Sequence, residues 1–318
     1  MGRRVTWVVV GGVAAVAVAA AVETLRGGPE ASLAPTTTPE RPQPAIVGPA
    51  VAISGQDGVR DLLEATGASG VLYFGDRTCR LRTLLLPEAR WRPEPNRSVP
   101  CRFTVDAGGA VHPDEVRVEP ESGLRAVCHE GGIDVLHREG AGLASFPGAC
   151  APAWRPDGSL SFVRDGELVL VPDLRDEHIL LSRAEVTTTL GPGSHLLEAA
   201  WFDEDTYAAA VRRGRETTLA VFRGNELVGR PTYSSPRVDE LRTRRRVVAA
   251  RTGTSGPAIT FFSRRGREIL TVEGGHSVSW SPSGTVAAVA GRALTIFVDP
   301  ATRERAALAL VATDLEWR

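Results

Sequence analysis

Apolar residues in this chain occur first as one long run and afterwards as many short ones. The long run extends from Val5 to Val22, with Arg3 and Arg4 before it and Glu23 after it. As a helix that rises about 1.5 Å per residue, these 18 positions span roughly 27 Å, close to the ~30 Å hydrocarbon core of a bilayer. Residues 1–25 are therefore predicted to be a transmembrane anchor. Basic residues favour the cytoplasmic side, so the arginine pair predicts an N-in orientation with the rest of the chain outside the cytoplasm.

A cleavable signal peptide is the alternative interpretation of this segment. The small residues Ala17, Ala19 and Ala21 resemble an A-x-A cleavage site. The apolar run is longer than the roughly 7–15 residues usual in a signal peptide, which favours an uncleaved anchor. Both interpretations export the chain, either as a protein held at the cell membrane or as a secreted binding protein.

The composition changes twice after the anchor. Residues 26–49 are rich in proline and threonine, which predicts an extended linker. A capping box at 54–57 and a stop at Gly67 then predict a short helix near 55–66, with three apolar residues on one face: Val59, Leu62 and Leu63. The folded domain is expected to comprise residues 50–318.

Beyond Gly70 the apolar runs become short and are separated by Gly, Pro and Asp. Short β-strands at regular spacing are typical of a sandwich, a barrel or a propeller. The predicted strands are Val71–Phe74, Leu81–Leu86, Leu160–Val163, Glu167–Val171, Thr218–Phe222, Ala258–Phe262, Val286–Val289 and Leu294–Val298.

An internal repeat favours the propeller. The segment Ala151–Phe162 has a counterpart at Val278–Ala288 and a weaker copy at Ala199–Ala208. A degenerate copy surrounds Leu241, another unit opens at Cys101, and Leu315–Trp317 ends the chain where a further copy would begin. Equivalent positions recur roughly every 40 residues, the length of one four-stranded propeller blade.

These segments resemble the TolB-like, WD40-like (PD40) propeller repeats, whose core is P-x-W-S-P-D-G followed by an apolar strand. The match is good at Trp154, Pro156, Asp157 and Gly158, partial at Trp280, Pro282 and Gly284, and limited to the tryptophan and an acidic turn at Trp201. The resemblance covers roughly residues 70–318. It implies structural roles for all of these residues, with tryptophans packed between blades and tight Pro-Asp-Gly turns.

The end of the chain predicts how the propeller closes. Ala309–Trp317 is expected to form the first strand of the blade that contains Val71–Phe74 and Leu81–Leu86. Such pairing removes exposed sheet edges. With that shared blade counted, the predicted fold is an all-β, six-bladed β-propeller closed by its C-terminal strand.

The cysteines lie at 79, 101, 128 and 150. Four cysteines allow three connectivities. The pairs Cys79–Cys101 and Cys128–Cys150 have the same separation of 22, as if one bridge were made in two consecutive repeats. We therefore expect these two disulfides, which suit an oxidising compartment. A zinc site is the alternative, but no C-x-x-C motif or histidine cluster supports it.

The charged residues indicate which kinds of partner the chain could bind. The net charge of −1 argues against nucleic-acid binding. All 37 basic residues are arginine, a composition expected of a GC-rich genome such as that of an actinobacterium. The densest basic cluster is Arg242, Arg244, Arg245 and Arg246. It is either a patch for an anionic envelope polymer or lipid headgroup, or a solvated strand balanced by Asp239 and Glu240.

Catalytic motifs are absent from the sequence. There is no G-x-S-x-G elbow, and the six histidines lack metal-ligand spacing. We therefore expect no catalytic, cofactor or metal residues, and a non-catalytic platform for another envelope protein or an anionic wall polymer. The alternative is an extracytoplasmic enzyme acting on carbohydrate or peptide in the propeller funnel. Carboxylates and arginines that converge in the ring would favour the enzyme.

The anchor interpretation gives the first prediction. The protein should remain with membranes after a carbonate wash, because an apolar helix of this length partitions into the bilayer. N-terminal sequencing should find no cleavage near Ala21. Mature chains that begin between Ala20 and Glu23 would contradict the anchor and favour secretion.

Overall fold

The computed structural model describes residues 55–92, 97–106, 109–113, 116–231, 233–253 and 256–318. The chain divides into a unit up to Ala45 and a second unit from Ile46 onward, and all described residues belong to the second. The predicted anchor at 5–22, the linker at 26–49 and Ser54 lie outside the described residues. Within those residues, no helix has both the length and the apolar character needed to span a bilayer.

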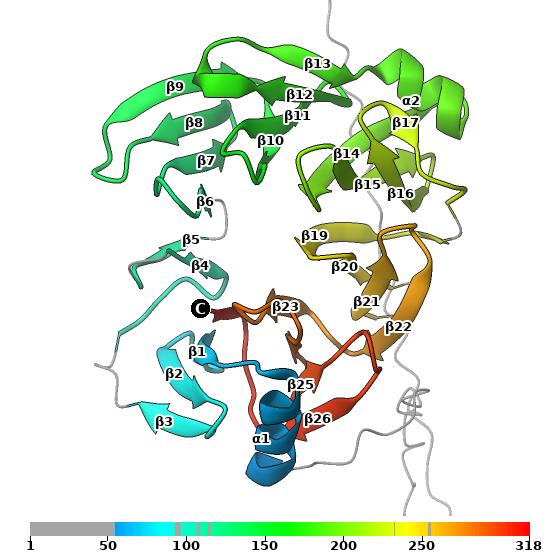
Figure 1. Cartoon of the computed structure of the whole chain (residues 1–318). Helices are drawn as coiled ribbons and strands as arrows, with labels where there is room; N and C mark the ends of the chain where they lie inside the picture. Colours follow the sequence, from blue (N-terminus) through cyan, green and yellow to red (C-terminus); the bar gives the residue numbers. More distant parts are fainter. Residues whose placement is uncertain (1–54, 93–96, 107–108, 114–115, 232, 254–255) are drawn as a thin grey trace, which may run out of the picture. The chain divides into compact units, whose positions relative to one another are not determined.

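The described residues form seven antiparallel sheets (Figure 1). The strands of the first three sheets are β27 (Leu315–Trp317), β1 (Gly70–Gly75), β2 (Leu81–Leu86) and β3 (Arg90–Arg92); β4 (Phe103–Val105) and β5 (Val111–Pro113); and β6 (Val116–Val118), β7 (Arg125–His129), β8 (Gly132–Leu136) and β9 (Gly142–Pro147).

The other four sheets follow in chain order. Their strands are β10 (Cys150–Trp154), β11 (Leu160–Arg164), β12 (Glu167–Val171) and β13 (His178–Leu181); β14 (Ser194–Trp201), β15 (Thr206–Arg213), β16 (Glu216–Arg223), β17 (Glu226–Leu227) and β18 (Ser234–Ser235); β19 (Val238–Arg244), β20 (Val247–Thr252), β21 (Ala258–Ser263) and β22 (Glu268–Glu273); and β23 (Ser277–Trp280), β24 (Ala287–Ala290), β25 (Thr295–Val298) and β26 (Arg305–Leu308).

Helices are few. Helix α1 (Gly55–Thr66) covers the range expected from the sequence, and its buried residues Val59, Leu62 and Leu63 belong to the core that joins the first and last sheets. Helix α2 (Arg183–Leu190) was not expected. It begins with a capping box, in which the Ser182 hydroxyl accepts a hydrogen bond from the Glu185 amide and Glu185 accepts one from the Ser182 amide. A 3-10 turn, η1, covers Pro172–Leu174.

The number of sheets differs from the predicted six blades. The eight strands predicted from apolar runs all fall on observed strands, but β4 and β5 form a separate two-stranded sheet between β3 and β6. Their runs are three residues long, and Pro113 ends the second. Such short runs carry little periodic signal, so the sequence pattern counted the unit that opens at Cys101 as a single blade with the strands that follow it.

Hydrogen bonds link the first strands of successive sheets. The Trp154 indole donates to the Arg117 carbonyl (2.9 Å), and the Trp280 indole donates to the Arg242 carbonyl (2.9 Å). Two further links between first strands are Thr243 Oγ1 to the Trp201 carbonyl and Thr104 Oγ1 to the Val116 carbonyl (3.3 Å). Trp201 Nε1 also donates to Ser161 Oγ on β11, the second strand of the preceding sheet (2.7 Å). These bonds satisfy polar groups that the packing of the sheets would otherwise remove from water.

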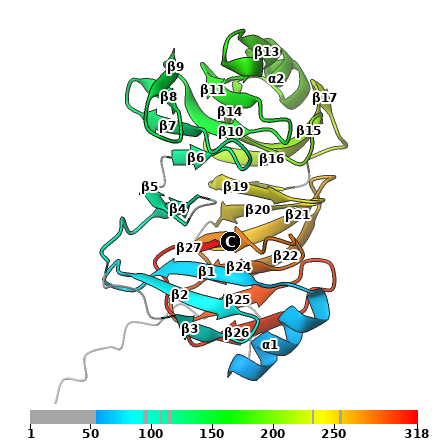
Figure 2. The same cartoon turned by 60° about the vertical axis from the view of Figure 1, so that its left-hand side comes forward.

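The C-terminal strand β27 pairs with β1, the first strand along the chain, as Figure 2 shows. Asp314, directly before β27, accepts hydrogen bonds from the Phe103 amide on β4 (2.8 Å) and from the Ser277 hydroxyl on β23. The Trp317 amide donates to Ser279 Oγ (2.9 Å). The last five residues therefore contact three different sheets.

Gly70 makes the pairing of β1 and β27 possible. Its φ is +133°, a conformation that L side chains rarely adopt. A Cβ there would lie 2.4 Å from the Arg318 carbonyl oxygen and 3.1 Å from Trp317 Nε1. Glycine is thus required where the two ends of the domain meet.

Truncating Trp317 tests the contribution of β27. Its side chain is 2% exposed and packs edge-on against Phe297, with ring centroids 5.7 Å apart. We expect Trp317→Ala to lower the free energy of unfolding by about 3–5 kcal/mol, measured by urea denaturation, because it leaves a large cavity. Trp91→Ala, at a tryptophan that is 53% exposed, is the control and should cost far less. Equal losses would contradict a structural role for β27.

Candidate functional site

The turn residues of the repeat hold the hairpins at the end of each first strand. Asp157 Oδ1 accepts hydrogen bonds from the Ser159 amide (3.0 Å) and hydroxyl (2.6 Å), and Gly158 has a φ of +82°. In the partial copy, the Pro282 carbonyl accepts a hydrogen bond from Arg244 (2.7 Å). Gly284 lies so close to Arg244 that a Cβ would be 2.5 Å from its Cγ. These residues stabilise turns.

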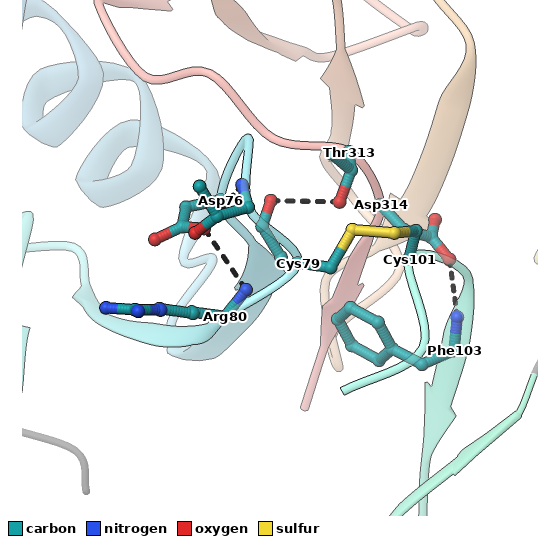
Figure 3. Close-up of a disulfide and its surroundings, with 9 residues drawn as sticks. Asp76, Cys79, Arg80, Cys101, Phe103, Thr313 and Asp314 are labelled. Atoms are coloured by element: carbon teal, nitrogen blue, oxygen red, sulfur yellow. Dashed lines mark hydrogen bonds between the residues drawn. A yellow bond between two sulfur atoms is a disulfide. The ribbon is translucent and has the colours of Figure 1, made fainter. Parts of the chain in front are cut away.

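The predicted disulfide Cys79–Cys101 is confirmed, with a Cα–Cα distance of 4.9 Å. Figure 3 shows that it ties the loop between β1 and β2 to the segment before β4. Close to it, Thr313 donates to the Gly75 carbonyl (3.2 Å) and Asp314 accepts from Phe103. The bridge therefore lies beside the segment that leads into β27. In the chain-entropy model a loop of this length contributes roughly 3 kcal/mol.

The second predicted disulfide is not formed, since Cys128 and Cys150 are free thiols in the structure. Cys79 and Cys101 are in loops, whereas Cys128 lies within β7 and Cys150 begins β10 of the next sheet. The equal separations of 22 are therefore not copies of one repeated bridge. Burial raises the pKa of Cys150, and the neighbouring Cys128 raises it further.

The four arginines of the predicted basic patch separate into two groups. Arg242 lies within β19, and its side chain acts electrostatically on Glu198 and Glu316. Arg244 ends β19, and Arg245 and Arg246 form the exposed turn to β20. Of the two acids proposed to balance them, Asp239 pairs with Arg251 (2.9 Å) and Arg237 (2.8 Å) instead, and Glu240 pairs with Arg251.

Arg242 belongs to a group of charges that the sequence analysis missed. We call Arg117, Glu198, Arg242 and Glu316 the inner charge cluster, because they lie on β6, β14, β19 and β27, each the first strand of its sheet. Both arginines act electrostatically on both carboxylates. The Leu241 amide donates to Glu198 (3.0 Å), and Arg318 pairs with Glu316 (3.0 Å). Four segments far apart in the sequence thus bring their charges together.

Removal from water dominates the electrostatics of the two carboxylates. Burial raises the pKa of Glu198 to about 7, although Arg117, Arg242 and the Leu241 amide each lower it. Burial also raises the pKa of Glu316, against the opposing effect of Arg318 and Arg242. Carboxyl groups that titrate near neutral pH are suited to proton transfer and are enriched in functional sites.

One sequence signal could have located this cluster. Glu198 interrupts an otherwise apolar strand, Leu196–Trp201, three residues before the repeat tryptophan. Glu316 directly precedes the repeat tryptophan Trp317. A charged side chain on a first strand can lie close to the first strands of other sheets, as these two do. Which charges meet still depends on how the sheets are placed, and local spacing does not encode that placement.

The described residues contain no group of three or more His, Cys, Asp or Glu side chains able to hold a metal ion. The inner charge cluster has two carboxylates and two guanidinium groups, and guanidinium groups repel cations. Its chemistry is that of paired charges that can bind a polar ligand or move a proton.

Comparison with known proteins supports the fold. No protein-family model matches the sequence, and comparison with curated proteins also gives no match. Two similar structures are 6-phosphogluconolactonase-like proteins, from Bacteroides uniformis (TM-score 0.52, 10% identity, covering 79% of this chain and 100% of that one) and from Bacteroides fragilis (0.51, 12%, 80% and 99%). A third is a Lactobacillus plantarum protein (0.52, 10%, 79% and 99%). At this identity the likeness shows the fold alone, which is a β-propeller.

The raised pKa of Glu198 gives a pH-dependent prediction. Between pH 4.5 and 7 the native state keeps a proton that the unfolded state has released, so this residue lowers stability as the pH rises. Glu198→Gln removes this dependence. Between pH 4.5 and 7.5 the free energy of unfolding of the variant, relative to wild type, should increase by about 1–3 kcal/mol. Urea denaturation over this pH range measures the difference, and Glu273→Gln, at an exposed position of β22, is the control. Parallel pH profiles for wild type and Glu198→Gln would contradict it.

Proposed function

We propose that this chain is a membrane-anchored β-propeller displayed outside the cytoplasm, where it acts as a non-catalytic platform that binds an anionic polymer of the cell envelope. Residues 5–22 would be the anchor, and residues 26–49 the spacer between membrane and propeller. The observation that carries the binding proposal is an arginine-rich surface on two adjacent hairpin turns of the β19–β22 sheet. An acidic face of another envelope protein is the alternative partner.

We further propose that the seven sheets form one closed ring, with the β4–β5 hairpin as a reduced seventh unit. The pairing of β27 with β1 and the hydrogen bonds between the first strands of neighbouring sheets support this. A closed ring leaves only short, protected strand edges and presents its turns in a fixed arrangement. A rigid arrangement lowers the entropy cost of binding.

The arginine surface consists of the residues at these two turns: Arg244, Arg245, Arg246, Arg264, Arg265 and Arg267. The turns lie side by side, since the Arg264 amide donates to the Arg246 carbonyl (2.8 Å). Five of the six are exposed: Arg244, Arg245, Arg246, Arg265 and Arg267. Arg264 itself is part-buried and pairs with Asp203.

At least four acids lie near the six arginines of this surface. Asp203 is engaged with Arg264, the exposed Glu204 and Asp205 follow it in the same turn, and Glu268 accepts a hydrogen bond from Thr271 (3.0 Å). The surface therefore has a local positive surplus in a chain whose net charge is −1. Such asymmetry concentrates anions at one face.

Arginine chemistry favours a polymer of phosphate or carboxylate groups. The guanidinium group binds both anions through two parallel hydrogen bonds and is weakly hydrated. Exposed contacts of this kind are individually weak and screened by salt. A polymer can occupy several arginines at once, which makes the combined binding useful.

The test removes three charges from the surface. In the triple variant Arg245→Gln, Arg246→Gln, Arg265→Gln, the Kd for polyphosphate and for polygalacturonate should rise at least tenfold at 50 mM NaCl, and wild-type binding should weaken at 300 mM. The matched control removes three exposed arginines elsewhere: Arg212, Arg215 and Arg230. It should change the Kd less than threefold. Equal effects of the two triple variants, or binding that salt does not weaken, would contradict the proposal.

A second candidate function is an enzyme that uses the inner charge cluster. It is favoured by one observation, that Glu198 and Glu316 lie among Arg117 and Arg242, with both carboxyl pKa values raised. In such an enzyme one carboxyl would act as general acid and the other as base or nucleophile. If wild type turns over a glycan or peptide, and Glu198→Gln and Glu316→Gln each abolish this turnover, the protein is an enzyme and not a non-catalytic platform.

A further inference from the structure

A cavity of about 760 Å³ lies on the first sheet, and its lining residues are far in sequence from those of the arginine surface. Its walls come from β1, β2 and β3 and from the segment that leads into β27, with Trp91, Asp76, Arg82, Arg92 and Leu310 among the lining residues. The volume is within the range of about 300–1,000 Å³ typical of small-molecule sites. We call it the Trp91 cavity.

Trp91 gives the cavity a flat apolar wall. Its side chain is 53% exposed, and with Leu143 and Ile179 it is one of three large apolar side chains that remain exposed in the described part of the chain. It contacts Phe74 edge-on, with ring centroids 5.6 Å apart. The contact fixes the indole while leaving much of its surface in water. Covering that surface with the apolar face of a ligand is favourable.

Asp76 and Arg82 form the polar wall. Arg82 Nε pairs with Asp76 Oδ2 at 3.1 Å. This contact uses the Nε–H of the guanidinium group and does not use its two Nη groups. Burial would raise the pKa of Asp76, but hydrogen bonds from Thr78, Arg80 and Arg82 outweigh it and hold the pKa well below its ordinary value. Asp76 is therefore ionised at neutral pH.

The polar wall is held in place before any ligand binds. The Thr78 amide (2.9 Å), the Thr78 hydroxyl (2.7 Å) and the Arg80 amide (3.1 Å) all donate to Asp76 Oδ1 (Figure 3 shows the Arg80 bond). Cys79, in the same loop, is fixed by its disulfide to Cys101. A prearranged site binds with a smaller loss of entropy.

Charge indicates the class of ligand. Arg82 and Arg92 place two guanidinium groups, each with five N–H donors, beside the single carboxylate of Asp76 in the lining. Adjacent donor and acceptor groups match neighbouring sugar hydroxyls, the indole face matches the apolar face of a pyranose ring, and guanidinium groups match a carboxylate.

We propose that the Trp91 cavity binds an acidic saccharide of one to three units, with the sugar ring against Trp91 and its carboxylate held by Arg82 and Arg92. The cavity shares no residue with the arginine surface. Failure of one proposal therefore does not imply failure of the other. A short saccharide tests the cavity without spanning several surface arginines.

The experiment is calorimetric titration of the full chain with trigalacturonate, with neutral maltotriose, inorganic phosphate and AMP as comparison ligands. Trigalacturonate should bind more tightly than the other three. Trp91→Ala should weaken its binding at least tenfold, and Trp91→Tyr, which keeps an aromatic ring, should weaken it less than threefold. Arg82→Gln should weaken trigalacturonate binding by a larger factor than maltotriose binding.

Ile179→Ala, at another exposed apolar residue, and the arginine triple variant are the matched controls and should leave trigalacturonate binding within twofold of wild type. Thermal unfolding of each variant checks that it folds. Absence of trigalacturonate binding, equal binding by wild type and Trp91→Ala, or phosphate or AMP binding as tight as trigalacturonate would each overturn the proposal.

Discussion

The fold depends on the hydrogen bonds that tie the first strand of each sheet to its neighbours. A sheet of this size needs a covered hydrophobic face for stability, and its first strand has an edge without a ladder partner on one side. Here side chains replace the missing ladder: Trp154 and Trp280 donate to carbonyls one sheet away, and Asp314 accepts from two sheets at once. The two ends of the domain meet at β1 and β27, where only glycine fits at position 70.

This constraint also explains where charges can gather. Some charged residues on first strands are brought close to one another, although Asp239 on β19 pairs within its own sheet. Glu198 and Glu316 lose water in the inner charge cluster and are balanced in part by Arg117 and Arg242. Arg245 and Arg246, in the turn that follows β19, remain exposed, whereas Arg242 within the strand is half-buried.

The sequence predicted features that are local and missed those that depend on how sheets are placed. The strands, helix α1 and the 79–101 bridge followed from apolar periodicity, capping and spacing. The β4–β5 hairpin was missed because its runs are short, and the second bridge was wrongly predicted because equal spacing does not imply equal geometry. Helix α2 had a readable signal in Ser182 and Glu185. The inner charge cluster combines residues from four distant strands, and the Trp91 cavity joins residues 74–92 with Leu310 and Val311, which no local pattern joins.

In the fold described above, the C-terminal strand β27 is part of the core and not a frayed end. Native-state hydrogen exchange of the amides at the C-terminal end measures this directly, because protected amides there can exchange only when this segment separates from β1 and β23. The Arg318 amide, which donates to the Val71 carbonyl (2.9 Å), and the Trp317 amide should exchange as slowly as the amides of β15 and β16 in the interior. Exchange of β27 at the rate of an unstructured terminus, while β15 and β16 stay protected, would contradict it.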